Sequence, residues 1–218
     1  MEKKKVIFIA GPTSSGKTAV SLEVAKRTDG EIVSCDSMQI YKKMDALTQA
    51  PSETLTKKTP HFFVRIIDPS EEYNVARFVV EAKDVIKDII SRGKTPIVTG
   101  GTGLYMKALM DGIFDSPPKD ERIRGELSFL AKEKGAAVLH SRLAAVDPLT
   151  AKKLHPNDIR RIVRALEVYQ LTGRTIHEKK QEATGIWEEY SCRIFGMDVP
   201  RKELYQRIDK TVEKMFEK

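Results

Sequence analysis

Short apolar runs alternate along the first half of the chain with segments in which apolar residues recur every three or four positions. Such runs are typical of strands buried on both faces, and the longer spacing is typical of helices that pack on them. The expected strands cover residues 6–10, 31–34, 62–67 and 95–99, with a returning strand at 191–199. The expected helices cover 17–27, the segment between the N-cap Asn74 and Gly93, a segment after Gly103, and one that has Pro200 at its first position. Alternating strands and helices predict an α/β fold with a parallel sheet covered on both faces.

The pattern changes after Gly112. Residues 115–118 read Asp-Ser-Pro-Pro, a break typical of a linker, and from Asp120 to about Lys180 the spacing is helical without a strand. The sequence therefore predicts an α/β core at 1–114, a helical insertion at 115–184 and a return to the core at 185–218.

Charge is concentrated in the predicted insertion. The chain carries 38 Lys and Arg against 31 Asp and Glu, a net charge of +7, and residues 116–180 alone hold 14 basic and 8 acidic residues. A local basic excess suits a polyanion such as nucleic acid, although a lysine-rich solvated surface explains the same count. Cys35 and Cys192 are too few for a disulfide framework. No apolar run is long enough to span a membrane and no secretory signal precedes the first strand, so a cytoplasmic protein without membrane contact is expected.

The turn after the first strand has the pattern G-x-x-x-x-G-K-[ST], and a helix follows it. In this setting successive backbone N–H groups point at phosphate oxygens, a lysine neutralises the terminal phosphate and a hydroxyl ligates Mg²⁺. The expected phosphate-binding residues are Gly11, Pro12, Thr13, Ser14, Ser15, Gly16, Lys17 and Thr18, with Thr18 as the Mg²⁺ ligand. A structural glycine turn is the alternative, and nucleotide hydrolysis does not follow from phosphate binding.

One carboxylate, Asp36, follows the second strand at the sheet edge where parallel α/β folds bind ligands. An aspartate there is suited to act as a general base, a metal ligand or an acceptor for a substrate hydroxyl. A turn residue that caps the chain into Ser37 is an equally good explanation.

Four sequence blocks, in order, resemble the tRNA dimethylallyltransferases, also called tRNA isopentenyltransferases. They are the phosphate-binding loop, DSMQIYKKMD at 36–45, GGTGLY at 100–105 and RRIVRALEVY at 160–169. The resemblance implies a P-loop NTPase-like sheet and transfer of a dimethylallyl group from dimethylallyl diphosphate. The acceptor in this family is the exocyclic amine of the adenosine on the 3′ side of the tRNA anticodon.

The resemblance also implies roles for single residues. Lys17 and Thr18 would stabilise the departing diphosphate, and Asp36 would remove a proton from the amine, which is a poor nucleophile. Thr102 would lie against the reactive site. Contacts with tRNA are implied for Asp36, Ser37, Met38, Gln39, Thr102, Arg124, Arg160, Arg161 and Arg164, and a contact with the diphosphate for Arg201. A solvated helix face is the alternative for the arginines, and a turn cap for Thr102.

Members of this family continue beyond the position of Lys218, so the chain is expected to be a truncated member, with weakened or no transferase activity. A monomer is expected. Three other hypotheses stay open: an adenylate isopentenyltransferase, a P-loop small-molecule kinase, and an RNA-binding fragment without enzymatic activity.

Overall fold

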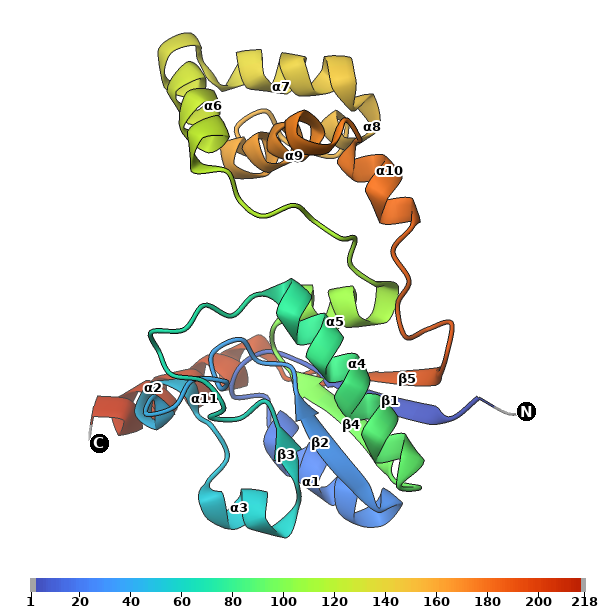
Figure 1. The fold of residues 1–218 in the computed structure, drawn as a ribbon. Helices are drawn as coiled ribbons and strands as arrows, with labels where there is room; N and C mark the ends of the chain where they lie inside the picture. The colour runs from blue at the N-terminus through green and yellow to red at the C-terminus, as the bar shows by residue number, and fades with distance from the viewer. Residues whose placement is uncertain (1–2, 217–218) are drawn as a thin grey trace. The chain divides into compact units, whose positions relative to one another are not determined.

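A five-stranded parallel sheet forms the centre of the larger of two compact units (Figure 1). The computed structural model describes residues 3–216. The strand order is β3-β2-β4-β1-β5, and the strands are β1 Lys5–Ala10, β2 Gly30–Ser34, β3 His61–Phe62, β4 Thr95–Gly100 and β5 Ser191–Gly196. Every neighbouring pair is parallel, so the α/β prediction with a parallel sheet is confirmed.

The predicted strand at 62–67 is wrong beyond its first residue. Phe63 and Arg65 have φ angles of +61° and +54°, outside the extended region that a strand requires. Pairing resumes at one isolated bridge between Tyr41 and Ile67. The returning strand also ends at Gly196, three residues before its predicted end.

Helices cover both faces of this sheet (Figure 1). Helix α1 (Lys17–Thr28) packs on Ile9, Ile32 and Ile97, while α4 (Val75–Ser91) and α5 (Gly103–Asp111) lie on the opposite face. The side chain of Asn74 caps α4 by accepting from the N–H groups of its first turn, as predicted. Two short helices, α2 (Asp45–Thr48) and α3 (Glu53–Lys58), follow β2, and α11 (Arg201–Phe216) follows β5. Helix α11 begins one residue after Pro200, which was expected inside it.

The second compact unit comprises residues 113–184 and is entirely helical. Its helices are α6 Glu121–Lys134, α7 Ala136–Val146, α8 Pro148–Ala151, α9 Ile159–Thr172 and α10 Ile176–Gln181. They share a cluster of buried apolar side chains that includes Leu127, Leu143 and Ile162. The units divide after Gly112 and before Gly185. Phe114, which was expected in the core, packs against this cluster.

Within residues 3–216, no helix has the length and apolar character needed to cross a membrane.

Candidate active site

The turn expected to form a phosphate cradle covers residues 11–16, between β1 and α1. Gly16 has a φ of +91°, a conformation that favours glycine, and Ser14 also has a positive φ of +62°. The ammonium group of Lys17 folds back over the turn and donates to the carbonyl oxygen of Pro12 at 2.6 Å. Burial lowers the pKa of Lys17, and the negative charge of Asp36 opposes part of that shift.

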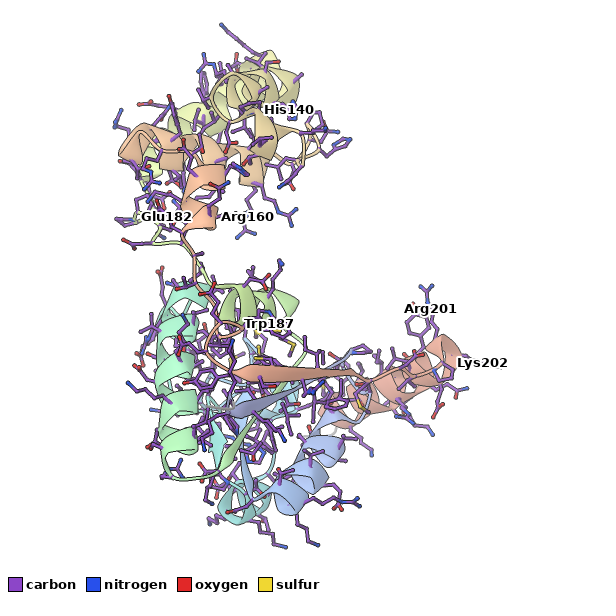
Figure 2. The ribbon with its side chains drawn as sticks, turned by 90° about the vertical axis from the view of Figure 1, so that its right-hand side faces the viewer. His140, Arg160, Glu182, Trp187, Arg201 and Lys202 are labelled. Carbon is purple, nitrogen blue, oxygen red and sulfur yellow. The ribbon has the colours of Figure 1, made fainter. Side chains whose placement is uncertain are left out.

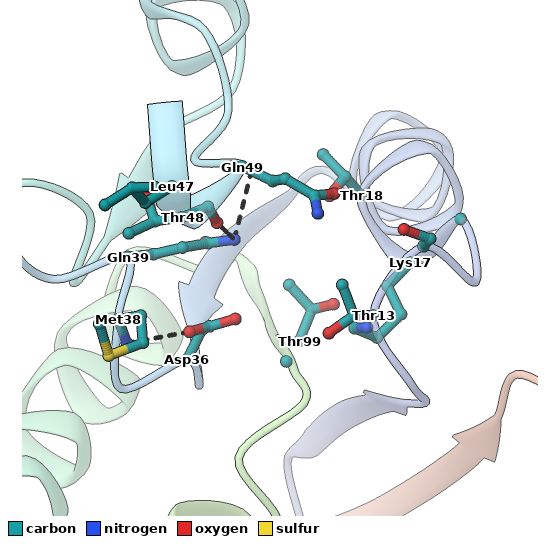
Figure 3. Close-up of a pocket in the computed structure, with 13 residues that line it drawn as sticks. Thr13, Lys17, Thr18, Asp36, Met38, Gln39, Leu47, Thr48, Gln49 and Thr99 are labelled. Carbon is teal, nitrogen blue, oxygen red and sulfur yellow. Dashed lines mark hydrogen bonds between the residues drawn. The ribbon is translucent and has the colours of Figure 1, made fainter. Parts of the chain in front are cut away.

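A cavity of about 340 Å³ lies between this turn and the carboxyl ends of β2 and β4 (Figure 3). Its volume is in the range of about 300–1,000 Å³ that is usual for small-molecule sites. The lining residues are Thr13, Ser14, Gly16, Lys17, Thr18, Asp36, Met38, Gln39, Leu47, Thr48, Gln49, Thr99 and Gly100. The structure thus brings the phosphate-binding turn and the Asp36 carboxylate to one cavity.

Asp36 both caps a turn and faces the cavity, the two alternatives considered from the sequence. Its Oδ1 accepts a hydrogen bond from the N–H of Met38 at 3.0 Å, which closes a turn, and its carboxylate also lines the cavity. The turn therefore orients the carboxylate toward the space in which a substrate would lie.

Thr102 holds the Asp36 segment in place. Its hydroxyl accepts from the N–H of Ser37 at 3.0 Å, and its own N–H donates to the carbonyl of Cys35 at 3.2 Å. Neither Thr102 nor Ser37 is part of the cavity lining in the described residues. The close approach depends on Gly100, because a Cβ there would lie 2.0 Å from the carbonyl oxygen of Cys35. Thr102 thus positions the Asp36 segment, and its expected place against the reactive site stays a prediction.

Gln39 fixes the wall opposite the phosphate-binding turn. Its side-chain oxygen accepts from Ser34 Oγ at 3.1 Å, and its side-chain nitrogen donates to the carbonyls of Thr48 and Gln49 at 3.5 Å (Figure 3). Gln39, implied as a tRNA contact, therefore also anchors α2 to the end of β2.

Five lining residues were not among the site residues expected from the sequence: Leu47, Thr48, Gln49, Thr99 and Gly100. Helix α2 is a single turn with no periodic signal, so Leu47 and Thr48 within it and its C-cap Gln49 could not be found from spacing. Thr99 could have been found, because it precedes Gly100 at the carboxyl end of a buried strand, as Asp36 follows one.

Two of the arginines implied as tRNA contacts are engaged inside the insertion. Arg124 donates to both oxygens of Glu167 at 2.8 and 3.1 Å, and Arg164 donates to the same carboxylate at 2.5 Å. Glu167 is fully buried and also accepts from the N–H of Asp120 at 2.7 Å. Burial raises the pKa of Glu167, but the hydrogen bonds from the two arginines and the N–H outweigh it and hold the pKa below its ordinary value. The structure gives Arg124 and Arg164 a structural role.

The other two arginines of α9 are exposed. The Arg161 side chain is largely in solvent and lies 3.1 Å from the Asp158 carboxylate, and Arg160 is exposed on the same helix (Figure 2). Arg201 (Figure 2), which was expected to reach the diphosphate, lies on α11. Its guanidinium stacks on the ring of Tyr205 and donates to the hydroxyl of that residue. Arg201 is not among the described residues that line the cavity.

The cavity suits a magnesium ion that would be bound mainly by the phosphates of a ligand and only in part by protein oxygens. The Thr18 hydroxyl lines the cavity at the first turn of α1, and Mg²⁺ is commonly bound by one or two protein oxygens together with phosphates and water. Within the described residues, no group of three or more His, Cys, Asp or Glu side chains forms an all-protein metal site. The donor set therefore fits Mg²⁺ bound with a diphosphate.

Known proteins with similar sequences come from one family of transferases. A family described as IPP transferase matches residues 39–218. The tRNA dimethylallyltransferase 2 of Geotalea daltonii is 48% identical over 99% of this chain and 66% of its own length, and that of Geotalea uraniireducens is 50% identical over 99% and 70%. The chain thus spans about two thirds of the length of these relatives.

Solved structures of such transferases also resemble this chain. A eukaryotic dimethylallyltransferase described as acting on tRNA has a TM-score of 0.82 and 35% identity, over 98% of this chain and 53% of that one. The full-length tRNA isopentenylpyrophosphate transferase of Bacillus halodurans has a TM-score of 0.65 and 38% identity, over 99% and 67%.

Proposed function

The chain belongs to the IPP transferase family, and from that premise we propose that it transfers a dimethylallyl group from dimethylallyl diphosphate to an adenosine of tRNA. The acceptor in this proposal is the exocyclic amine of the adenosine on the 3′ side of the anticodon. The observation that carries the proposal is the single cavity that has Lys17 and Thr18 on one wall and Asp36 on another.

Each wall suits one half of the reaction. The exocyclic nitrogen attacks C1 of the dimethylallyl group, and the bond from C1 to the diphosphate oxygen breaks with its electron pair moving to the diphosphate. Lys17 and the N–H groups of the turn stabilise this growing charge. Asp36 accepts the proton that the amine loses, and Mg²⁺ bound near Thr18 would neutralise further charge on the diphosphate.

The adenine must leave its stack to enter a cavity of this kind. The tRNA loop must therefore be held by its phosphates while one base is extruded. The exposed Arg160 and Arg161 of α9 are suited to that task, because guanidinium groups bind phosphate oxygens through paired N–H donors.

Transfer from labelled dimethylallyl diphosphate tests the proposal. The label is offered with tRNA, with AMP and with no acceptor, using the wild type, Lys17→Ala, Asp36→Asn and, as a matched control, Asp84→Asn at an exposed position of α4. We expect label in tRNA only, a loss of at least about 100-fold for the first two variants, and no change for the control.

Other outcomes identify other functions. Label in AMP would indicate an adenylate isopentenyltransferase, and ATP turnover without need for the isoprenoid would indicate a kinase. Transfer to tRNA that survives Asp36→Asn unimpaired would contradict the base assignment. Binding of tRNA without transfer, even in a protein extended to the length of its relatives, would indicate an RNA-binding module.

A further inference from the structure

The cavity contains hydroxyl groups that have no partner in the protein. Among residues 3–216, the buried side-chain oxygen and nitrogen atoms without a hydrogen bond are Ser15 Oγ, Thr48 Oγ1 and Thr99 Oγ1. Thr48 and Thr99 both line the cavity, and Thr48 is only 8% exposed. A buried hydroxyl without a partner costs free energy, so folded proteins seldom keep one unless an ordered water or a ligand completes it.

Thr99 lies on the side of the cavity that contains the phosphate-binding turn. It is the fifth residue of β4, which runs between β1 and β2, and it pairs with Ile9 and Ser34 on those strands. Side chains alternate along a strand, so Thr99 is on the same face as Ile97, which packs on α1. Figure 3 shows Thr99 between the Asp36 carboxylate and the group formed by Thr13 and Lys17.

The backbone of Thr99 is already satisfied, which leaves the side chain as the free group. Its carbonyl accepts from the N–H of Cys35 at 2.7 Å. Its hydroxyl makes no hydrogen bond to Asp36, although both line the same cavity. The hydroxyl lines the same cavity as Lys17, so it is free to donate to a ligand that enters, and an anionic oxygen is the acceptor that the Lys17 ammonium would attract there.

We propose that the Thr99 hydroxyl donates a hydrogen bond to the diphosphate of the donor substrate, as a further binding residue beyond the phosphate-binding turn. The inference rests on the proposed function for the identity of the donor. It follows from the unpartnered Thr99 hydroxyl, which lines the same cavity as Lys17. The contact persists as the diphosphate departs, because its oxygens then carry more charge and accept more strongly.

Three variants separate a ligand contact from a structural role. Thr99→Val removes the hydroxyl at nearly constant shape, Thr99→Ser keeps it, and Thr48→Val removes the other unpartnered hydroxyl of the cavity from the wall that α2 forms. The measurements are the thermal midpoint of the ligand-free protein and the affinity for inorganic pyrophosphate by titration calorimetry.

We expect Thr99→Val to leave the thermal midpoint unchanged or raised, because it removes an unsatisfied buried group. We expect the same variant to bind pyrophosphate about 10-fold or more weakly, as for the loss of one hydrogen bond to a charged group. Thr99→Ser should stay within about 3-fold of the wild type, and Thr48→Val should bind pyrophosphate as the wild type does.

Pyrophosphate affinity of Thr99→Val equal to that of the wild type would overturn the inference. A lowered thermal midpoint would also overturn it, because the hydroxyl would then have a partner within the protein. Lys17→Ala distinguishes a failure of the inference about Thr99 from a failure of the proposed donor site. If Lys17→Ala weakens pyrophosphate binding and Thr99→Val does not, only the inference about Thr99 fails; if neither does, the proposed donor site itself is wrong.

Discussion

Replacing Arg124 tests whether this side chain holds the insertion together or holds RNA. Arg124 donates two hydrogen bonds to Glu167, whose side chain is fully buried. Arg124→Met keeps much of the aliphatic length and removes the charge. After the change, Glu167 keeps only its bonds from Arg164 and from the N–H of Asp120.

The loss of stability depends on how many hydrogen-bond donors still neutralise Glu167. Removing one partner of a buried ion pair costs about 3–5 kcal/mol. The Arg124 side chain is 35% exposed and Arg164 still neutralises Glu167, so we expect a smaller loss, about 2–4 kcal/mol. The insertion has 72 residues, for which a total stability of about 4–11 kcal/mol is typical. The change would therefore remove a large share of the stability of this unit.

Hydrogen–deuterium exchange of the full chain measures this loss within the insertion alone. A loss of this size lowers protection in α6 and α9 about 30- to 700-fold. Arg122→Met is the matched control, because Arg122 lies on the same helix in an exposed pair with Glu126 and should change protection less than about 3-fold. Equal protection in the two variants would refute the structural role. Weakened tRNA binding with unchanged protection would restore the RNA contact.

Three further predictions concern other groups. Gly100→Ala should cost about 3 kcal/mol or more and lower the thermal midpoint by about 6 °C or more, because its Cβ would overlap the Cys35 carbonyl, whereas Gly103→Ala has open space and should be neutral. Because burial lowers the pKa of Lys17, pyrophosphate affinity should begin to fall at a lower pH than it would with an ordinary lysine, as a calorimetric pH series would show. The pKa of Glu167 is lower in the folded chain than in the unfolded chain. The stability that Glu167 contributes is therefore complete above about pH 4.5 and is lost as the pH falls through the folded pKa. Protection of α9 from hydrogen exchange should fall with pH in the same way, and Glu167→Gln should make it depend less on pH.

The sequence could predict the parts of the fold that depend on local pattern. Continuous apolar runs gave the strands β1, β2 and β4 nearly to the residue, and the turn motif located the cradle. The segment after β3 could not be predicted in this way, because its conformation depends on distant partners. The N–H groups of Arg65 and Ile66 donate to the carbonyls of Gln39 and Ile40, more than twenty residues earlier in the chain.

The candidate site also has parts that follow from local sequence rules and parts that depend on distant contacts. The meeting of the phosphate-binding turn with Asp36 follows from the rule that parallel strands end at one edge of the sheet. The wall that α2 forms does not follow from any local rule, because a four-residue helix has no periodicity and is held by the side chain of Gln39. Unpaired hydroxyls such as that of Thr99 also become visible only when every neighbouring group is in place.

The arginines of α9 show why a count of charges overstates the surface available to RNA. Glu167 lies on the buried face of the helix, three residues after Arg164, and a carboxylate is stable there only when it is paired. It therefore draws Arg164 and Arg124 inward, although both count toward the basic excess of the insertion. The basic groups that remain exposed on this stretch are Arg160 and Arg161 with Lys152 and Lys153 ahead of them. In the proposed function, we expect these exposed groups to supply most of the contacts of this stretch with tRNA phosphates, because exposed cations release the counterions that make phosphate binding favourable.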